Sequence, residues 1–367
     1  MFEISVNKDD LLIPLNTVAG AVDRKQSLAI LSNFYLMLKD NILTVSATDL
    51  EIEIAATLTC SATIGEAAIT APAKKMLDIV RSLDDGSIPV FRFDDKNLTI
   101  KHGRSSFKLS TLPAESYPNR DDEQNDLEIQ FSRQQLVNLL QMTQFAMSQQ
   151  DVRFFLNGLY MEFEGEYITA VATDGHRMAI VRAPVSIASS CRLLLPRKGV
   201  IELLRLLNHI ADENIVIAMG KSHFKVTSSQ YSFTSKLIDS RFPPYQKAIP
   251  KTCDKSITID GQLLKKALQR ILILANEKLK GVLLHMQDNQ ITLIANNQEH
   301  DEAVETLEAK TVGSEIKLGL NAGYLADVLN HFADGPVLIS LSGPDNSILV
   351  ESTVQADFQY IIMPMKI

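Results

Sequence analysis

The chain has 367 residues, of which 46% are hydrophobic and 22% are charged. This composition is typical of a folded protein with a sizeable core and excludes an intrinsically disordered chain, and the length suggests two or three domains. The formal net charge of −8 excludes a uniformly basic surface, but it leaves open how the charge is distributed.

The chain opens with a short alternating strand, a capping residue and an amphipathic helix. This order occurs at three places: residues 2–6 before Asn7, residues 127–131 before Ser132, and residues 257–259 before Asp260. Asn, Ser and Asp side chains accept hydrogen bonds from the free N–H groups at a helix start. The first of these helices contains Pro14, so we expect it to be bent or shortened.

A second shared pattern is a strand that ends in a polar turn. It runs over residues 42–49, 167–174 and 290–297, and it ends on Asp49, Asp174 and Asn297. Asp and Asn favour turns because their side chains bond the backbone two residues further on. Another strand follows each turn, at residues 51–55, 178–182 and 303–307.

A second amphipathic helix follows these strands. In residues 196–207, Val200, Leu203, Leu204 and Leu207 fall on one face at the spacing i, i+3, i+4 and i+7. Residues 72–83 and the segment that starts at Asn321 repeat the pattern, with an acidic residue at the same place in each: Asp78, Glu202 and Asp327. Further alternating strands follow, at residues 90–93 and 107–109, 216–218 and 233–236, and 337–340 and 360–362.

A fixed period of roughly 124 residues indicates three copies of one domain. We predict an α+β fold in which each domain packs two helices on an antiparallel sheet. The predicted domains are residues 1–125, 126–250 and 251–367, which we name the first, second and third repeats. The polar segments 119–126 and 247–256 read as linkers between them.

The positive charge is concentrated in the predicted helices and their entry loops. Residues 8–25, 73–83, 132–153, 197–208, 262–280 and 321–333 hold about 16 Lys and Arg against about 8 Asp and Glu. One interpretation is that exposed helix faces are simply rich in basic residues. The sharper interpretation is a common basic surface that includes Lys74, Arg81, Lys198, Arg205, Lys265 and Lys266.

Three like domains joined end to end form an arc, and two arcs with complementary ends close head to tail into a ring. Basic helices on the inner side of such a ring would contact only the phosphates of duplex DNA. This arrangement gives affinity without sequence preference. The repeat therefore predicts a dimeric ring that encircles duplex DNA.

Six segments resemble one family in the right order: residues 151–158, 173–177, 196–203, 233–237, 276–278 and 363–365. The family is the beta subunit of bacterial DNA polymerase III, the sliding clamps, and the resemblance runs over the whole chain. It implies three DNA-clamp domains that close as a six-domain dimeric ring. It also implies a processivity factor in DNA replication that tethers the replicative polymerase, with no enzymatic activity.

The resemblance implies three sets of site residues. DNA contacts fall on Arg24, Lys25, Gln150, Arg153, Arg197 and Lys198. A pocket that buries Leu or Phe of a partner peptide falls on Leu156, Thr173, Gly175, His176, Arg177, Met178, Pro243, Lys247, Ala248, Leu279, Asn321, Tyr324, Ser347, Ile362, Met363, Pro364 and Met365. The dimer interface falls on Lys75, Arg104, Phe107, Leu109, Ile273, Leu274, Glu299, Glu302 and Glu305.

Three of these positions, and Ser106 beside Phe107 of the dimer interface, depart from the commoner family pattern. Lys247 stands for an arginine, Ala248 for a larger aliphatic residue, Leu279 for a phenylalanine and Ser106 for an arginine. The implied partners are duplex DNA, a second copy of the chain, the DNA polymerase III alpha subunit, the clamp loader and other proteins with a clamp-binding motif. No cofactor is implied.

Other classes of function are weaker. Asp174 and His176 suggest catalysis, but no serine or cysteine lies in a recognisable nucleophile motif nearby. The segment 220–222 ends like a phosphate loop but has Ile215 where that motif needs glycine, so we expect a hairpin turn. A peptide-binding scaffold that does not encircle DNA remains the main alternative.

The three cysteines, Cys60, Cys191 and Cys253, are far apart in the sequence. Their spacing predicts reduced thiols in a cytosolic protein rather than disulfides or a zinc site. The seven histidines lack the spacing of metal ligands. No apolar run approaches about 18 residues, so we expect a soluble, cytoplasmic protein without a membrane partner.

Overall fold

The computed structural model describes residues 2–23, 28–60, 62–65, 67–94, 96–118, 125–186 and 190–366, without the side chains of 2 and 62–64. The chain divides into two compact units. The first unit comprises Met1–Val137 with Lys198–Leu237, and the second comprises Asn138–Arg197 with Ile238–Ile367. Each unit combines residues from neighbouring repeats.

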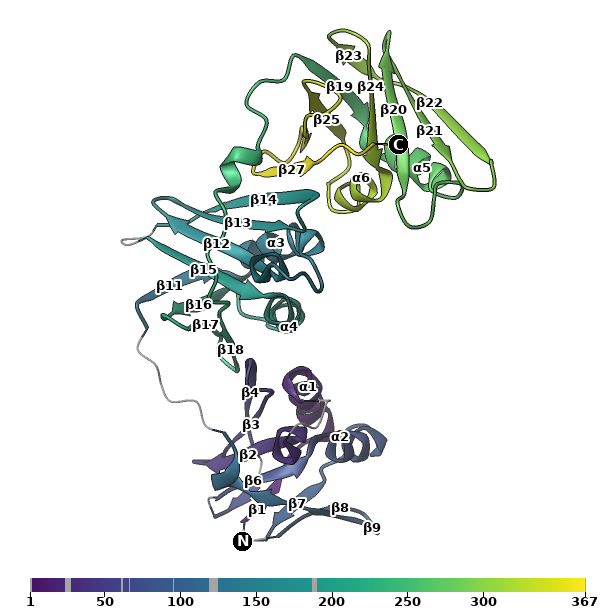
Figure 1. The fold of residues 1–367 in the computed structure, drawn as a ribbon. Coiled ribbons are helices and arrows are strands. Elements are labelled where there is room, and N and C mark those ends of the chain that lie inside the picture. The colour runs from purple at the N-terminus through teal and green to yellow at the C-terminus, as the bar shows by residue number, and fades with distance from the viewer. Residues whose placement is uncertain are drawn as a thin grey trace. The chain divides into compact units, whose positions relative to one another are not determined.

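Each repeat contributes two α-helices to the described part of the chain (Figure 1). They are α1 (Lys8–Val18), α2 (Ala73–Ser82), α3 (Arg133–Gln141), α4 (Arg197–Leu207), α5 (Gly261–Ile271) and α6 (Ala322–Leu329). Short 3-10 turns flank them: η1 (Ala19–Ala21), η2 (Ala29–Ser32), η3 (Ala114–Ser116), η4 (Gln144–Ala146), η5 (Phe154–Asn157) and η6 (Tyr245–Ala248). The predicted pair of helices per repeat is confirmed.

The predicted capping residues start the first helix of each repeat. The side-chain oxygen of Asn7 accepts a hydrogen bond from the N–H of Asp9 at 2.8 Å. Ser132 accepts from Gln135 at 3.4 Å, and Asp260 accepts from Leu263 at 2.8 Å. Each cap satisfies one N–H that a helix start leaves without an internal partner.

The predicted shortening of the first helix is wrong. Pro14 lies inside α1. Helix α1 nevertheless has 11 residues, the same length as α5. Proline removes one backbone donor from a helix, but the Pro14 ring is buried against the core. We attribute the intact length of α1 to this packing, which offsets the lost hydrogen bond.

The first unit contains two antiparallel sheets. One has the strand order β5-β1-β7-β8-β9 and the other has the order β10-β6-β2-β3-β4-β18-β17-β16-β11. From the first repeat come β1 (Phe2–Ser5), β2 (Asn33–Lys39), β3 (Ile42–Thr48), β4 (Ile52–Thr59), β5 (Ala62–Ile64), β6 (Ala67–Pro72), β7 (Val90–Phe93), β8 (Asn97–His102), β9 (Ser105–Ser110) and β10 (Leu112–Pro113). The second repeat adds β11 (Leu127–Ser132), β16 (Asn214–Met219), β17 (His223–Thr227) and β18 (Tyr231–Lys236).

The second unit also contains two antiparallel sheets. Their strand orders are β15-β12-β13-β14-β27-β26-β25-β19-β23 and β22-β21-β20-β24. The second repeat contributes β12 (Gly158–Glu164), β13 (Tyr167–Thr173), β14 (Arg177–Pro184) and β15 (Cys191–Pro196). The third repeat contributes β19 (Lys255–Asp260), β20 (Gly281–Gln287), β21 (Gln290–Asn296), β22 (Glu302–Glu308), β23 (Lys310–Val312), β24 (Ile316–Asn321), β25 (Pro336–Leu341), β26 (Ile348–Ser352) and β27 (Phe358–Ile362).

The prediction of a single sheet for each repeat is wrong. The strands of each repeat fall into two sheets, and in the first and third repeats the helices contact both sheets. In the first repeat, α2 contacts β2 and β6 of one sheet and β9 of the other. Because an alternating pattern shows only which face of a strand is buried, it did not reveal that two sheets share one helical layer.

Neighbouring repeats are joined by strand pairing as well as by linkers. Strand β18 of the second repeat pairs with β4 of the first, and β27 of the third repeat pairs with β14 of the second. Each nine-stranded sheet therefore continues from one repeat into the next. The predicted linker 119–126 lies largely outside the described residues, and the predicted linker 247–256 already enters β19 at Lys255.

The cores form under the predicted apolar faces. Met76, Val80 and Leu83 are buried, whereas Lys74, Asp78 and Arg81 are exposed. Val200, Leu203, Leu204 and Leu207 are likewise buried. Helices α1 and α2 lie side by side, as do α5 and α6 (Figure 1).

Candidate functional site

The strand β13 ends in a turn that the Asp174 side chain holds closed. One carboxylate oxygen of Asp174 accepts the N–H groups of His176 at 2.9 Å and Arg177 at 3.0 Å. The Thr173 hydroxyl donates to the Arg177 carbonyl at 2.6 Å and accepts the N–H of Gly175 at 3.0 Å. Gly175 has φ +89°, a conformation that other residues rarely adopt.

The predicted Asx-type turn recurs in the other two repeats. The side chain of Asp49 accepts the N–H groups of Glu51 and Ile52, and that of Asn297 accepts those of Glu299 and Asp301. Three repeats thus reach the same turn with the same side-chain chemistry.

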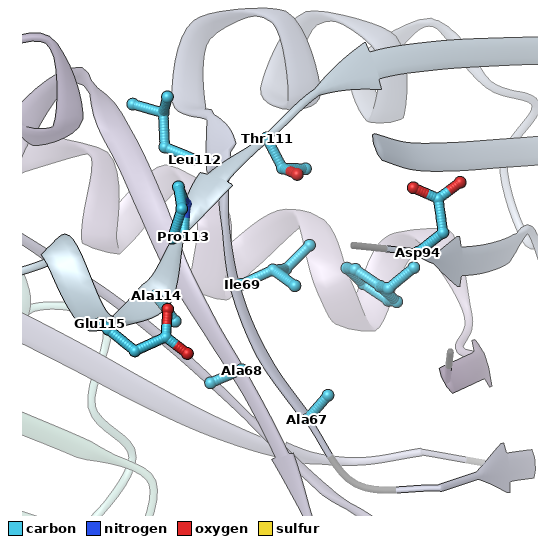
Figure 2. A pocket seen from close by; sticks show the side chains of 10 residues that line it. Ala67, Ala68, Ile69, Asp94, Thr111, Leu112, Pro113, Ala114 and Glu115 are labelled. Atoms are coloured by element: carbon cyan, nitrogen blue, oxygen red, sulfur yellow. The ribbon is translucent and has the colours of Figure 1, made fainter. Parts of the chain in front are cut away.

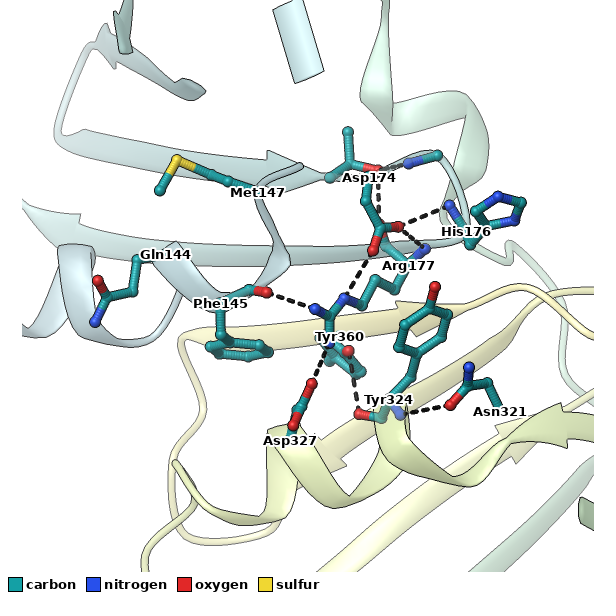
Figure 3. A network of polar contacts seen from close by, with 12 residues as sticks. Gln144, Phe145, Met147, Asp174, His176, Arg177, Asn321, Tyr324, Asp327 and Tyr360 are labelled. Atoms are coloured by element: carbon teal, nitrogen blue, oxygen red, sulfur yellow. Dashed lines mark hydrogen bonds and ion pairs between the residues drawn. The ribbon is translucent and has the colours of Figure 1, made fainter. Parts of the chain in front are cut away.

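Arg177 connects this turn to the third repeat (Figure 3). Its guanidinium donates to Asp174 at 3.0 Å, to Asp327 of α6 at 2.5 Å and to the carbonyl of Phe145 at 2.6 Å. It also lies 4.5 Å from the ring centroid of Tyr324. Burial acts to lower the pKa of Arg177, but contacts with Tyr360, Asp327 and Asp174 outweigh burial and raise this pKa above its usual value.

The C-terminal segment lies against the same turn. Ile362 pairs with Arg177 across β27 and β14. The N–H of Met363 donates to the His176 carbonyl at 2.9 Å, and the N–H of Met365 donates to the Gly319 carbonyl at 2.9 Å. The Met363 side chain is 39% exposed, so it forms part of the surface beside His176.

The N-terminal end of α6 forms another part of this surface. The Asn321 side chain accepts the N–H of Tyr324 at 3.1 Å and donates to the Leu279 carbonyl at 3.1 Å. The side chain of Leu279 is 58% exposed. The Tyr360 hydroxyl donates to the Tyr324 carbonyl at 3.2 Å, which fixes α6 to β27.

An apolar cluster underlies these residues. It contains Met178, Val171, Ile180, Tyr245, Leu349 and Ile361, with Tyr160, Phe242, Ala248 and Ile249 packed against it. The Ser347 hydroxyl donates to the Ala248 carbonyl at 3.3 Å. The Tyr160 and Phe242 rings stack at 4.5 Å, and burial followed by the charge of Glu162 raises the pKa of Tyr160 to about 12.

Most of the predicted peptide-pocket residues therefore come together in the second unit. Leu156, Met178 and Ile362 are at most 5% exposed, so they lie beneath the surface. Pro243 and Lys247 are exposed on the segment that contains η6. We call the set formed by Thr173–Met178, Leu279, Asn321–Tyr324 and Met363–Met365 the tail site.

The predicted DNA-contact residues occupy two kinds of environment. Arg24 and Lys25 lie outside the described residues. Lys74, Arg81, Gln150 and Lys266 are exposed, and Lys265 is half-buried. Arg153 is exposed but held by Asp151 at 2.9 Å, and Lys198 pairs with Asp49.

Two predicted DNA contacts carry local structural roles that the sequence did not predict. Arg205 donates to the carbonyls of Asn16 at 3.3 Å and Thr17 at 2.8 Å and pairs with Glu202 at 2.9 Å. Arg197 donates to the Met147 carbonyl at 3.1 Å. The last carbonyls of a helix lack internal partners, so the end of α1 attracts the Arg205 guanidinium.

Four of the nine predicted dimer-interface residues lie on edge strands of two separate sheets. Phe107 and Leu109 belong to β9, the edge of one sheet, with Lys75 and Arg104 exposed in the same unit. Glu302 and Glu305 belong to β22, the edge of another sheet. In the same unit Glu299 is exposed, Ile273 is 77% exposed and Leu274 is half-buried.

Two of these interface residues are already engaged within the chain. Leu109 is 8% exposed, so its own unit buries it. Both carboxylate oxygens of Glu305 accept from Arg270, at 2.5 and 2.7 Å, and this contact lowers the pKa of Glu305. Glu305 was predicted to lie in the dimer interface, and Arg270 is a partner within the chain that the sequence did not predict.

Two cavities among the described residues are lined by none of the predicted site residues. One of about 280 Å³ is lined by Ile69, Asp94, Pro113 and their neighbours (Figure 2). Another, of about 740 Å³, lies beside Ile13, His209 and Asp212. Residues 220–222 form the predicted hairpin turn between β16 and β17.

The described residues contain no cluster of three or more His, Cys, Asp or Glu side chains that would hold a metal ion. In the same residues, no helix is long and apolar enough to cross a membrane. All three cysteines are free thiols.

Sequence reasoning missed the contribution of Asp327 to the tail site. A signal was available, because Asp327 occupies the repeated acidic position shared with Asp78 and Glu202. Phe145 and His331 were also missed. Their rings stack at 4.3 Å beside Arg177, and nothing in the local sequence pattern indicated this contact.

Comparison with known proteins identifies the family. Models of the N-terminal, central and C-terminal domains of the DNA polymerase III beta subunit match residues 2–121, 130–244 and 246–366. The beta sliding clamps of Salmonella typhimurium and Escherichia coli K12 are each 38% identical over 366 residues, covering 100% of both chains. The DNA polymerase III subunit beta of Pseudomonas aeruginosa superposes with a TM-score of 0.96 at 36% identity, covering 100% of both chains, and one of its structures contains bound griselimycin. The chain belongs to the DNA polymerase III beta subunit family.

Proposed function

We propose that this chain is a DNA sliding clamp, a non-enzymatic processivity factor that encircles duplex DNA as a homodimer. Its three domains would be residues 1–125, 126–250 and 251–367, and it would act in the cytoplasm. One observation supports the ring most directly. Strands β9 and β22 lie at the edges of their sheets, whereas the corresponding strands in the other repeats pair with a strand on both sides. Pairing of β9 with β22 of a second chain would leave neither edge free.

The repeat predicts the register of this joint. Phe233 of β18 pairs with Ile54, and Tyr360 of β27 pairs with Ala179. Phe107 occupies the corresponding position of β9, and Ala303 occupies that of β22. Phe107 of one chain therefore lies opposite Ala303 of the other, which places Ser106 opposite Val304 and Lys108 opposite Glu302.

Cysteines at positions 106 and 304 test this joint. Directly opposed residues of antiparallel strands bring their Cβ atoms to about 4.5–5.5 Å, close enough for a disulfide after a small adjustment. We expect the double variant S106C/V304C, in a background without Cys60, Cys191 and Cys253, to form a covalent dimer on mild oxidation. Non-reducing electrophoresis measures the product.

The matched control shifts the register by two residues. S106C/E302C keeps two cysteines on the same strands, but their Cα atoms are too far apart for an unstrained disulfide. Each single cysteine variant completes the control set. Equal crosslinking of the shifted pair, or none in S106C/V304C, contradicts the proposed joint.

Contact with DNA would be sequence-independent and carried by phosphates. The exposed Lys74, Arg81 and Lys266, with Lys265, support this because basic side chains on helices suit the DNA backbone. The exposed polar residue Gln150 belongs to the same proposed set. Arg24, Lys25, Arg153 and Lys198 complete the proposed set. Arg197 and Arg205 contribute less in this proposal, because backbone carbonyls already hold their guanidinium groups.

The tail site would bind a short peptide of the DNA polymerase III alpha subunit, the clamp loader or another protein with a clamp-binding motif. The repeat supports one such site per chain. The junction of the second and third repeats has His176, Met178 and Met363. The corresponding positions at the junction of the first and second repeats are Glu51, Glu53 and Lys236. Charged side chains at those positions do not suit a peptide that buries Leu or Phe.

A further inference from the structure

We propose that Asp327 is a positioning residue for the tail site, acting through Arg177 to fix the distance between two surfaces that contact a bound peptide. This inference rests on the proposed function, since it concerns the same peptide site. One surface is the Thr173–Met178 turn of the second repeat. The other is the start of α6, in the third repeat.

The geometry places Arg177 between these surfaces (Figure 3). Its side chain is 11% exposed, and its guanidinium reaches both Asp174 in the turn and Asp327 in α6. Asp327 lies three residues after Tyr324 and six after the capping residue Asn321, and thus on the same helix as both. The ion pair therefore holds the first turns of α6 against the turn that contains His176.

The pair also has surroundings that limit its movement. Arg177 lies over the Tyr324 ring at 4.5 Å and near the Phe145 ring at 5.7 Å. The His331 ring stacks on Phe145, and its Nδ1 lies 2.8 Å from the Asp327 carbonyl. A partly buried charge pair with this many contacts has one well-defined arrangement.

The fold itself does not depend on this pair alone. Strands β14 and β27 pair over five residues from each strand, including Arg177 with Ile362. Removing the Asp327 charge leaves this ladder intact, and Asp174 still neutralises Arg177. We therefore expect Asp327→Asn to fold and to alter the position of α6 relative to the turn.

The test measures binding of a fluorescein-labelled five-residue peptide that carries Leu and Phe, by fluorescence anisotropy on the full-length protein. We expect Asp327→Asn to weaken binding about tenfold, which corresponds to about 1.4 kcal/mol, with a melting temperature within a few degrees of wild type. Asp327→Glu, which keeps the charge, should bind more tightly than Asp327→Asn. The same peptide with alanine in place of Leu and Phe measures non-specific binding.

The chain offers a matched control at the repeated position. Glu202 corresponds to Asp327 in the second repeat and pairs with Arg205. Glu202→Gln removes an acid–arginine contact within α4, near the other junction, and we expect it to leave peptide affinity unchanged. Equal losses in Glu202→Gln and Asp327→Asn would overturn the inference.

A double-mutant cycle tests whether Asp327 acts through Arg177. Arg177→Gln alone and Arg177→Gln with Asp327→Asn should bind the peptide equally weakly, because the second change then has nothing to position. Multiplicative losses, or wild-type affinity of Asp327→Asn, contradict the inference. Failure of the wild-type protein to bind the peptide contradicts the proposed peptide site instead, so the two failures are distinguishable.

Discussion

Gly20 allows an arginine from the second repeat to reach the end of a helix in the first. A Cβ atom at Gly20 would lie 1.9 Å from Arg205 Nη2 and 2.1 Å from Glu202 Oε2. The guanidinium would have to move and would lose its bonds to the carbonyls of Asn16 and Thr17. Hydrogen bonds from a charged group to buried acceptors are among the stronger ones in proteins.

Replacing Gly20 by alanine should therefore destabilise the protein. Losing the Arg205 contacts costs roughly 1.5–3 kcal/mol, and restricting the unfolded chain recovers about 0.4–1 kcal/mol. We expect a net loss of about 1 kcal/mol in the free energy of unfolding, measured by urea denaturation. In an Arg205→Ala background the same change should cost nothing, and a similar loss there would contradict the mechanism.

The Arg153 guanidinium holds the Asp151 carboxylate in its charged form. Its hydrogen bonds and charge lower the pKa of Asp151 from 3.8 to about 2. Because the folded pKa lies below the unfolded value, this contact stabilises the folded loop above about pH 4 and is lost as the pH falls towards 2.

We expect Arg153→Ala to raise the pKa of Asp151 part of the way from about 2 to 3.8. The return is partial because the backbone N–H of residue 153 still donates to the carboxylate. Carbon-13 NMR of the Asp151 side-chain carboxyl group during an acid titration measures the change. An unchanged pKa would show that Arg153 is not its main cause.

At the scale of elements, the repeated patterns predicted individual helices and strands well. Apolar spacing placed Met76, Val80 and Leu83 on the buried face of α2 and just beyond its end. The polar residues Asp49, Asp174 and Asn297 predicted three Asx turns because their side chains act on neighbouring backbone groups. Local chemistry determines these features, so one sequence is enough to find them.

The pairing of strands between repeats could not be predicted from the sequence. Alternation in β14 predicts a buried face, but it does not say that Arg177 lies opposite Ile362. The role of Arg205 was missed for a related reason. An exposed position on an amphipathic helix predicts a solvated charge, and only the fold brings the end of α1 within its reach.

The tail site was predicted through the family resemblance, and the structure brings most of its residues together. Hydrogen bonds join Thr173 to Arg177, Met363 to His176, and Asn321 to Leu279. Their peptide-binding role remains a prediction. Asp327 was missed as part of this site because its partner, Arg177, is 150 residues away in the sequence.

At the scale of the whole molecule, the three repeats leave two sheet edges, β9 and β22, that correspond to paired strands elsewhere in the chain. Two junctions between repeats are made by strand pairing within one chain, and the strands β9 and β22 remain at sheet edges. A second chain satisfies both edges at once if the two chains associate head to tail. A net charge of −8 is compatible with DNA inside such a ring, because the basic residues are concentrated in the helices.

Encirclement and simple electrostatic binding predict different routes by which the protein leaves DNA. A closed ring leaves DNA only at an end or by opening, whereas a charged surface dissociates from any site at the same rate. Retention should therefore depend on whether the DNA has ends.

The most direct measurement is retention of labelled protein on nicked circular DNA, after loading by a bacterial clamp loader with ATP. Gel filtration separates DNA-bound from free protein, before and after one restriction enzyme linearises the circle. We predict stable retention on the circle and rapid loss after linearisation. Equal rates of loss from circular and linear DNA would contradict the ring and leave a peptide-binding scaffold that does not encircle DNA.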